Sequence, residues 1–286
     1  MVQEELNQLA YAWLIIAVSY LAVTFCLGSY LNSLRIFPLK LARSLLTLTV
    51  MIHWSLLIYF WTRVDPTEPS LLLASSFFAA LAVLACLVLL WRRRALPVVL
   101  FALPFTGVGM ILAAFLYDAD QVIRLPSVWL WSHVVLMVIG ELCFFFAACV
   151  GVTYLVAERR LRTGGGFSFF SGTLNSLPAI DFWNHRLLLS GLFFLSGGLL
   201  IGFFFAREFW QGAWWLDPKV VFALLVWVSY ASILLLRRMT MKTPGRWSAR
   251  AVLFGFLFAV LVSLGVDLFS DTRHSQMELR QESDTP

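Results

Sequence analysis

The sequence predicts an all-α, polytopic integral membrane protein of about eight transmembrane helices with both termini outside. Of its 286 residues, 60% are hydrophobic and only 13% are charged, whereas a soluble domain carries about 25% charged residues. The charges cluster between apolar runs of about 20 residues, and a helix of that length crosses a hydrocarbon core of about 30 Å. Lys and Arg are concentrated in alternate short loops, which sets the orientation of the helices.

Eight apolar runs define the predicted spans: residues 10–31, 41–61, 70–91, 96–117, 129–155, 187–206, 219–237 and 250–269. The fourth contains Pro104 and Gly107, which predict a kink that membrane helices tolerate. The sixth contains Gly198 and Gly202, a spacing that is common in helix packing and indicates no function by itself. We treat residues 1–286 as a single membrane domain and expect residues 275–286, which are polar, to be a disordered tail.

The sequence lacks the usual signatures of a self-contained enzyme. We find no Ser/His/Asp set and no metal-hydrolase motif, and the glycines at 164–166, in the long inner loop at about 158–186, lack the strand–loop–helix context of a phosphate-binding loop. The four cysteines lie inside apolar spans, and none forms the CxxC or CxxCH arrangement of a zinc, redox or covalent haem site. We therefore expect a protein that positions a molecule rather than one that turns over a substrate.

Histidines and tryptophans meet at one predicted membrane face. His133 lies at the outer end of the fifth span and His274 just beyond the outer end of the eighth. The loop between spans six and seven reaches the same face with Trp210, Trp214 and the run 217–219. An interfacial aromatic belt could explain the tryptophans, but it does not explain Asp-Pro-Lys, whose proline suits the first turn of a helix.

Two neutral imidazoles across an aromatic-lined surface can bind haem iron axially, and indoles can stack on the porphyrin. Position alone leaves open the alternative that each histidine is a solvated or interfacial residue. Two further groups lie deeper: His53 is about 12 Å below the outer end of span two, and Glu141 lies near the middle of span five. Acids inside membranes usually have a partner or a role. A contact between Glu141 and His53 is one hypothesis, and a protonated Glu141 bonded to a neighbouring helix is the other.

Several ordered motifs resemble the CcsA/HemX (ResC-like) family of cytochrome c assembly. The stretch 210–227 is similar to the family's tryptophan-rich WWD-type motif, W-G-x-x-W-x-W-D-P-K-E-x-W, at these positions: Trp210, Trp214, Asp217, Pro218, Lys219 and Trp227. Residues 133–155 resemble a family helix that begins with an external haem-ligand histidine. Residues 245–251 resemble the G-W-R-G-x-R-A start of the last helix, and 265–267 with His274-Ser275 resemble its end. The likeness covers about residues 45–276.

The resemblance implies a site for non-covalently bound haem b at the outer face. The axial ligands to the iron would be His133 and His274, and the haem-binding loop would contain Trp210, Trp214 and Asp217. His53 resembles a family histidine that serves a second haem within the membrane. The resemblance also implies delivery of haem to apocytochrome c, in a cytochrome c synthetase complex with a ResB/CcsB-like membrane protein. The implied location is the bacterial inner membrane, with a thylakoid membrane as the alternative.

Departures from the family pattern keep a second function open. Leu216, Val220 and Phe222 replace two tryptophans and a glutamate of the motif, and Leu235 stands where assembly members commonly carry a histidine. These changes favour a HemX-like regulator or accessory protein of tetrapyrrole synthesis, whereas the pair of external histidines favours cytochrome c assembly. A structural subunit or small-molecule carrier, the third option, leaves the clustering of histidines and tryptophans unexplained.

Overall fold

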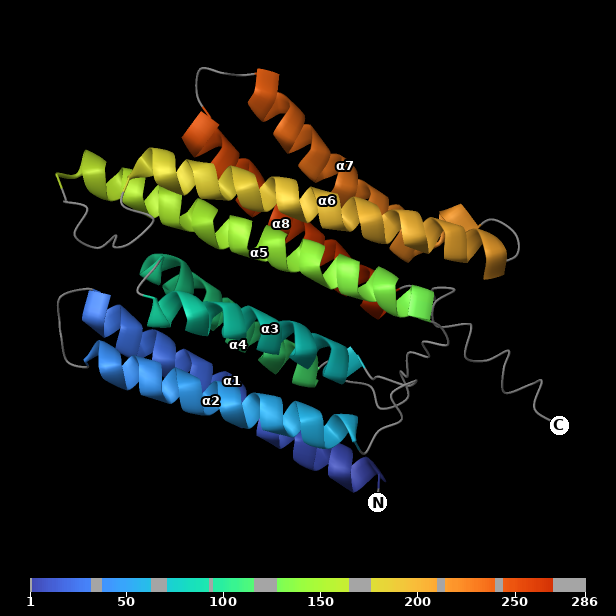
Figure 1. The fold of residues 1–286 in the computed structure, drawn as a ribbon, viewed down its shortest axis with the longest axis horizontal. Helices are drawn as coiled ribbons and strands as arrows, with labels where there is room; N and C mark the ends of the chain where they lie inside the picture. The colour runs from blue at the N-terminus through green and yellow to red at the C-terminus, as the bar shows by residue number, and fades with distance from the viewer. Residues whose placement is uncertain are drawn as a thin grey trace. The chain divides into compact units, whose positions relative to one another are not determined.

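The computed structural model describes residues 2–31, 38–62, 71–92, 95–115, 128–164, 176–209, 214–239 and 244–269. These residues form eight α-helices and the short 3-10 helix η2, with no strand among them (Figure 1). In chain order the elements are α1(Val2–Leu31), α2(Leu39–Trp61), α3(Leu71–Trp91), α4(Leu96–Phe115), α5(Val128–Arg162), α6(Leu177–Phe209), η2(Trp214–Leu216), α7(Pro218–Met239) and α8(Pro244–Phe269). The predicted all-α fold class is confirmed.

The helices follow the apolar runs of the sequence. Six of them are long and apolar enough to cross a membrane, and the apolar stretches described in α3 and α4 are shorter, at Ser75–Trp91 and Leu96–Leu112. The protein is therefore a multi-pass membrane protein, while the full number of spans and the side on which the termini lie stay predictions. The long inner loop is shorter than predicted, because α5 continues to Arg162 and α6 begins at Leu177. The predicted tail at 275–286 lies outside the described residues.

Helix packing divides the chain into two compact units, the first of which contains α1 to α4. These helices run alongside one another (Figure 1), with α1 against α2 and α4, and α3 against α2 and α4. Gly107 permits close approach of α4 to α1, since a Cβ at this position would lie 3.1 Å from the carbonyl oxygen of Ala17. Pro104 lies inside α4, which continues as a helix on both sides of it.

The second unit contains most of α5 together with α6, η2, α7 and α8. Within it, α7 packs against α6, α8 and η2, and α6 also contacts α8. Glycines bring α5 and α6 together: a Cβ on Gly140 would lie 3.1 Å from the backbone nitrogen of Leu195. The core of this unit includes a parallel stack of Phe144 on Tyr230, with ring centroids 3.7 Å apart and planes inclined by 1°.

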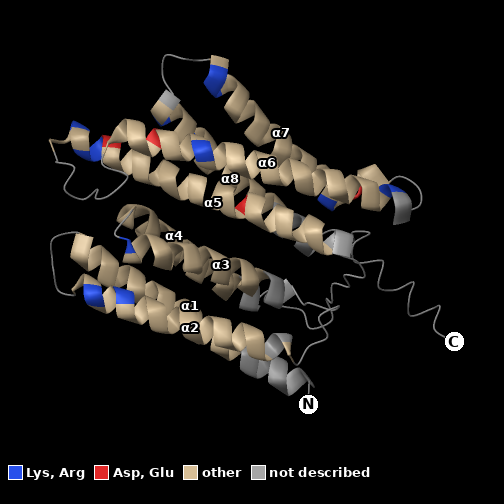
Figure 2. Ribbon diagram, viewed as in Figure 1, with Lys and Arg blue, Asp and Glu red and all other residues tan. Residues whose placement is uncertain are grey.

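Charged residues of the described helices lie mostly toward the helix ends (Figure 2). This distribution is what a hydrocarbon environment requires, because a charge at mid-membrane is costly. Glu141, which the sequence places inside the fifth span, lies within α5, and its side chain is exposed.

Candidate functional site

His133 lies in the first turns of α5, and its imidazole is held by the backbone of α6. Its Nδ1 is 2.7 Å from the carbonyl oxygen of Gly198. A carbonyl oxygen can only accept a hydrogen bond, so Nδ1 must carry the proton. In the neutral ring the lone pair is then on Nε2, the form in which histidine binds a metal.

Gly202 of α6 forms the surface on which the His133 ring lies. A Cβ on Gly202 would be 2.7 Å from Cε1 and 2.8 Å from Nδ1 of His133. The ring therefore occupies the space that any side chain at position 202 would need. The spacing of Gly198 and Gly202 in the sequence indicated only general helix packing. In the structure both glycines contact one residue, His133.

Trp214 lies at the same end of this unit, in η2. Its ring packs edge-to-face on Phe203, with centroids 5.2 Å apart, and on Trp215 at 5.9 Å. Phe203 directly follows Gly202 in α6, so the last turns of this helix contact both His133 and Trp214. Trp215 is 56% exposed and Leu216 is 69% exposed. An imidazole and an apolar surface rich in indole rings therefore lie at one end of the second unit.

Asp217 has a structural role at the start of α7. Its side chain is buried, and Oδ1 accepts a hydrogen bond of 2.9 Å from the backbone N–H of Lys219. Its own carbonyl accepts the first helical bond of α7, from the N–H of Val221 at 3.0 Å. Asp217 is therefore the N-cap of α7, and Pro218 occupies the first helical position that suits proline. The proposed role of Asp217 toward haem stays a prediction.

His53 lies in the first unit, and both of its ring nitrogens are hydrogen-bonded there. The ring is fully buried. The hydroxyl of Tyr20 is 2.6 Å from Nδ1 and that of Ser76 is 2.7 Å from Nε2. A neutral imidazole has one N–H and one lone pair, so one hydroxyl accepts and the other donates. Coordination of iron by His53, or its predicted contact with Glu141, would require one of these hydrogen bonds to break.

The structure thus brings together three of the predicted site residues, His133, Trp214 and Asp217, at the end of the second unit where α5 and α7 begin and α6 ends. His274 and Trp210 lie outside the described residues. Trp227, which lies in the stretch 210–227 that resembles the family motif, donates a hydrogen bond of 2.8 Å to the hydroxyl of Ser196 and so ties α7 to α6.

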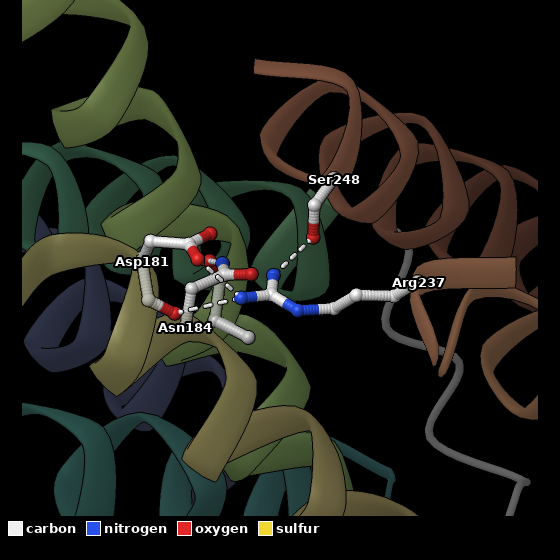
Figure 3. A network of polar contacts seen from close by, with 5 residues as sticks. Asp181, Asn184, Arg237 and Ser248 are labelled. Atoms are coloured by element: carbon white, nitrogen blue, oxygen red, sulfur yellow. Dashed lines mark hydrogen bonds and ion pairs between the residues drawn. The ribbon is translucent and has the colours of Figure 1, made fainter. Parts of the chain in front are cut away.

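A second polar cluster, which the sequence did not reveal, lies at the opposite end of α7 (Figure 3). The guanidinium of Arg237 pairs with the carboxylate of Asp181, donates to the carbonyl of Asp181 at 3.2 Å, and donates to the hydroxyl of Ser248 at 2.6 Å. Asn184 lies beside it and donates to the carbonyl of Ala147 at 2.8 Å. In the sequence, Arg237 is one of many Lys and Arg residues near the predicted loops, so its pairing within the helices was not predicted. Its contacts join α7 to α6 and α8.

The fold and these contacts define a multi-pass helical membrane protein that carries a fixed imidazole and an indole-rich surface at one end of its second unit. The chain belongs to the cytochrome c assembly protein family, whose model matches residues 39–274. This range includes every predicted site residue, from His53 to His274. The family assignment made from the sequence is confirmed.

Curated relatives of the chain are described as the cytochrome c biogenesis protein CcsA. The cytochrome c biogenesis protein CcsA of Prochlorococcus marinus (strain MIT 9312) is 26% identical over an alignment of 275 residues that covers 87% of this chain and 87% of that protein. The CcsA protein of Chlamydomonas reinhardtii is 31% identical over 151 residues, 53% of this chain and 41% of that protein. The CcsA protein of Nicotiana tomentosiformis is 29% identical over 203 residues, 63% of this chain and 64% of that protein. The chain thus spans less than two thirds of the length of the last two.

Proposed function

We propose that this protein takes part in cytochrome c biogenesis by binding haem b non-covalently at the outer membrane face and holding it for delivery to apocytochrome c. The observation that carries the proposal is the geometry of His133. Its Nδ1–H is engaged by the carbonyl of Gly198, so the lone pair of the neutral ring is on Nε2. Metal-binding histidines are commonly oriented in this way, by a backbone carbonyl at the other ring nitrogen. The residues present therefore fit an axial ligand to haem iron.

The indole-rich surface supports the same function. Trp214 is anchored on Phe203, and Trp215 beside it is exposed, so flat apolar rings are available for a porphyrin. The capping bond of Asp217 fixes the start of α7 directly after these tryptophans. The sequence pattern supports His274 as the second axial ligand and Trp210 as a further loop residue. We propose the outer site as the main one, because His53 would first have to give up a hydrogen bond.

The relatives support the cellular role. Each of the three named above is a cytochrome c biogenesis protein, and the matched family is defined by cytochrome c assembly. Haem would be the cargo of this protein, and apocytochrome c its recipient. We propose a ResB/CcsB-like membrane protein as the partner that completes a cytochrome c synthetase, in the bacterial inner membrane.

The optical and pyridine-haemochrome spectra of the detergent-purified protein test the proposal. We expect a b-type spectrum from the wild type, and at least a tenfold loss of retained haem in both His133→Ala and His274→Ala. The matched control is His185→Gln, which changes another histidine of the second unit, in the first turns of α6. A colourless protein from cells with ample haem would contradict the proposal and favour a HemX-like accessory role in tetrapyrrole synthesis.

A further inference from the structure

The contacts of His133 with α6 lead to a further inference, which rests on the proposed binding of haem. We propose that Gly198 and Gly202 are positioning residues for the ligand: the carbonyl of Gly198 selects the tautomer of His133, and the missing side chain of Gly202 sets the place of its ring. Neither glycine would touch the iron. Both would act through the imidazole.

The hydrogen bond explains the selection of the tautomer. Free imidazole exchanges its proton between the two ring nitrogens, and only a nitrogen with a lone pair can bind iron. Because the carbonyl of Gly198 lies 2.7 Å from Nδ1, it stabilises the form with the proton there. The alternative tautomer would place two acceptors, Nδ1 and the carbonyl oxygen, against each other. The backbone of α6 thus leaves Nε2 as the coordinating atom before any haem arrives.

Steric fit explains why position 202 lacks a side chain. Non-bonded carbon and nitrogen atoms do not approach to the 2.7 and 2.8 Å that a Cβ at position 202 would have from Cε1 and Nδ1 of His133. An imidazole is rigid, so a methyl group here would force the whole ring to rotate away. Such a rotation breaks the alignment with the carbonyl of Gly198, and the tautomer is no longer fixed.

The chain supplies a matched control one residue before Gly198. A Cβ on Gly197 would meet only Cδ1 of Leu136, at 3.5 Å, an ordinary contact. Gly197→Ala and Gly202→Ala therefore add the same methyl group to the same helix, and only the second collides with His133. Gly198→Ala is a poorer probe, because its Cβ would meet Sδ of Met137 at 2.8 Å and the backbone nitrogen of Met137 at 3.3 Å, contacts that do not involve the His133 ring.

The first experiment needs no haem. Histidine-selective ¹⁵N labelling and NMR report the protonation of each ring nitrogen, and His133→Ala identifies the signals of this residue by their disappearance. We expect the Nδ1–H tautomer in the wild type and in Gly197→Ala, and a mixture of tautomers in Gly202→Ala. Unchanged His133 signals in Gly202→Ala would overturn the inference, whether or not the protein binds haem.

A double-mutant cycle of thermal stability, with Gly202→Ala and His133→Ala, tests the same contact if Gly202→Ala folds poorly. The ring causes the collision, so Gly202→Ala should lower the melting temperature in the wild-type background and leave it nearly unchanged in the His133→Ala background. An equal loss in both backgrounds would contradict the contact and overturn the inference.

The haem-bound protein separates this inference from the proposed function. We expect Gly202→Ala to lower the fraction of low-spin haem and to shift its midpoint potential, and we expect added imidazole to restore the low-spin spectrum. Wild-type binding of haem through His133, with an unchanged spectrum and potential in Gly202→Ala, would overturn the positioning role alone. A wild type without haem whose ring signals still respond to Gly202→Ala would contradict only the haem function.

Discussion

Arg237→Ala should destabilise the second unit far more than the loss of an exposed charge near a helix end, because Arg237 is buried in an ion pair with Asp181. Arg237 and Asp181 side chains are only 9% and 20% exposed, and removal of one partner of a buried ion pair costs about 3–5 kcal/mol. The lost bond to Ser248 contributes about 1 kcal/mol of this. Because Asp181 keeps some access to solvent, we expect a loss near the lower limit, about 3 kcal/mol.

Equilibrium unfolding in mixed detergent micelles, followed by circular dichroism, measures this loss. The matched control is Arg238→Ala, the next residue along α7, which is exposed and should change the free energy of unfolding by less than about 0.5 kcal/mol. The double variant Asp181→Leu/Arg237→Met should be more stable than Asp181→Leu or Arg237→Met alone, because each single variant leaves one charged side chain buried without its partner. A loss below about 1 kcal/mol for Arg237→Ala would show that the ion pair contributes little to stability. Losses in Asp181→Leu/Arg237→Met equal to the sum of those in Asp181→Leu and Arg237→Met would show that the two side chains do not interact.

Three further predictions follow from single contacts. Asp217→Ala should cost about 1 kcal/mol of unfolding free energy, whereas Asp217→Asn, which keeps the capping acceptor, should cost less; equal losses in the same unfolding assay would argue against a cap. Tyr20→Phe removes one hydroxyl from buried His53 and should cost about 1–3 kcal/mol, while the haem spectrum stays unchanged; a changed spectrum would indicate that His53 binds iron. Gly191→Ala places a Cβ 2.6 Å from the ring of Phe144 and should cost about 1–3 kcal/mol; an unchanged melting curve and aromatic circular dichroism would contradict this packing.

Hydropathy predicted the helices because the membrane imposes a minimum length on each apolar run. The same rule misplaced the start of α6. Its first turns contain Asp181, Asn184 and Arg186, which lower the hydropathy, so the predicted span began at 187 instead of Leu177. These polar residues are helical nonetheless, since Asp181 pairs with Arg237 and Asn184 bonds to the backbone of α5.

The capping role at the start of α7 was partly visible in the sequence, because proline favours the first helical position and aspartate the position before it. The contacts of His133 were not visible in the sequence. Gly198 and Gly202 are far from His133 along the chain, and their spacing is the same as in ordinary helix packing. The hydrogen bonds of His53 to Tyr20 and Ser76 likewise depend on how three helices pack. No local sequence pattern predicts such contacts between residues that are distant along the chain.

The proposed binding of haem by His133 for cytochrome c assembly can be tested in cells that lack this protein. The measurement is the amount of covalently haem-stained c-type cytochrome after complementation with the wild type, His133→Ala or His185→Gln, with and without imidazole in the medium. We predict that His133→Ala loses the stained cytochrome, that imidazole restores part of it, and that His185→Gln behaves like the wild type. Wild-type levels of cytochrome c in cells with His133→Ala would show that His133 is not needed for cytochrome c assembly.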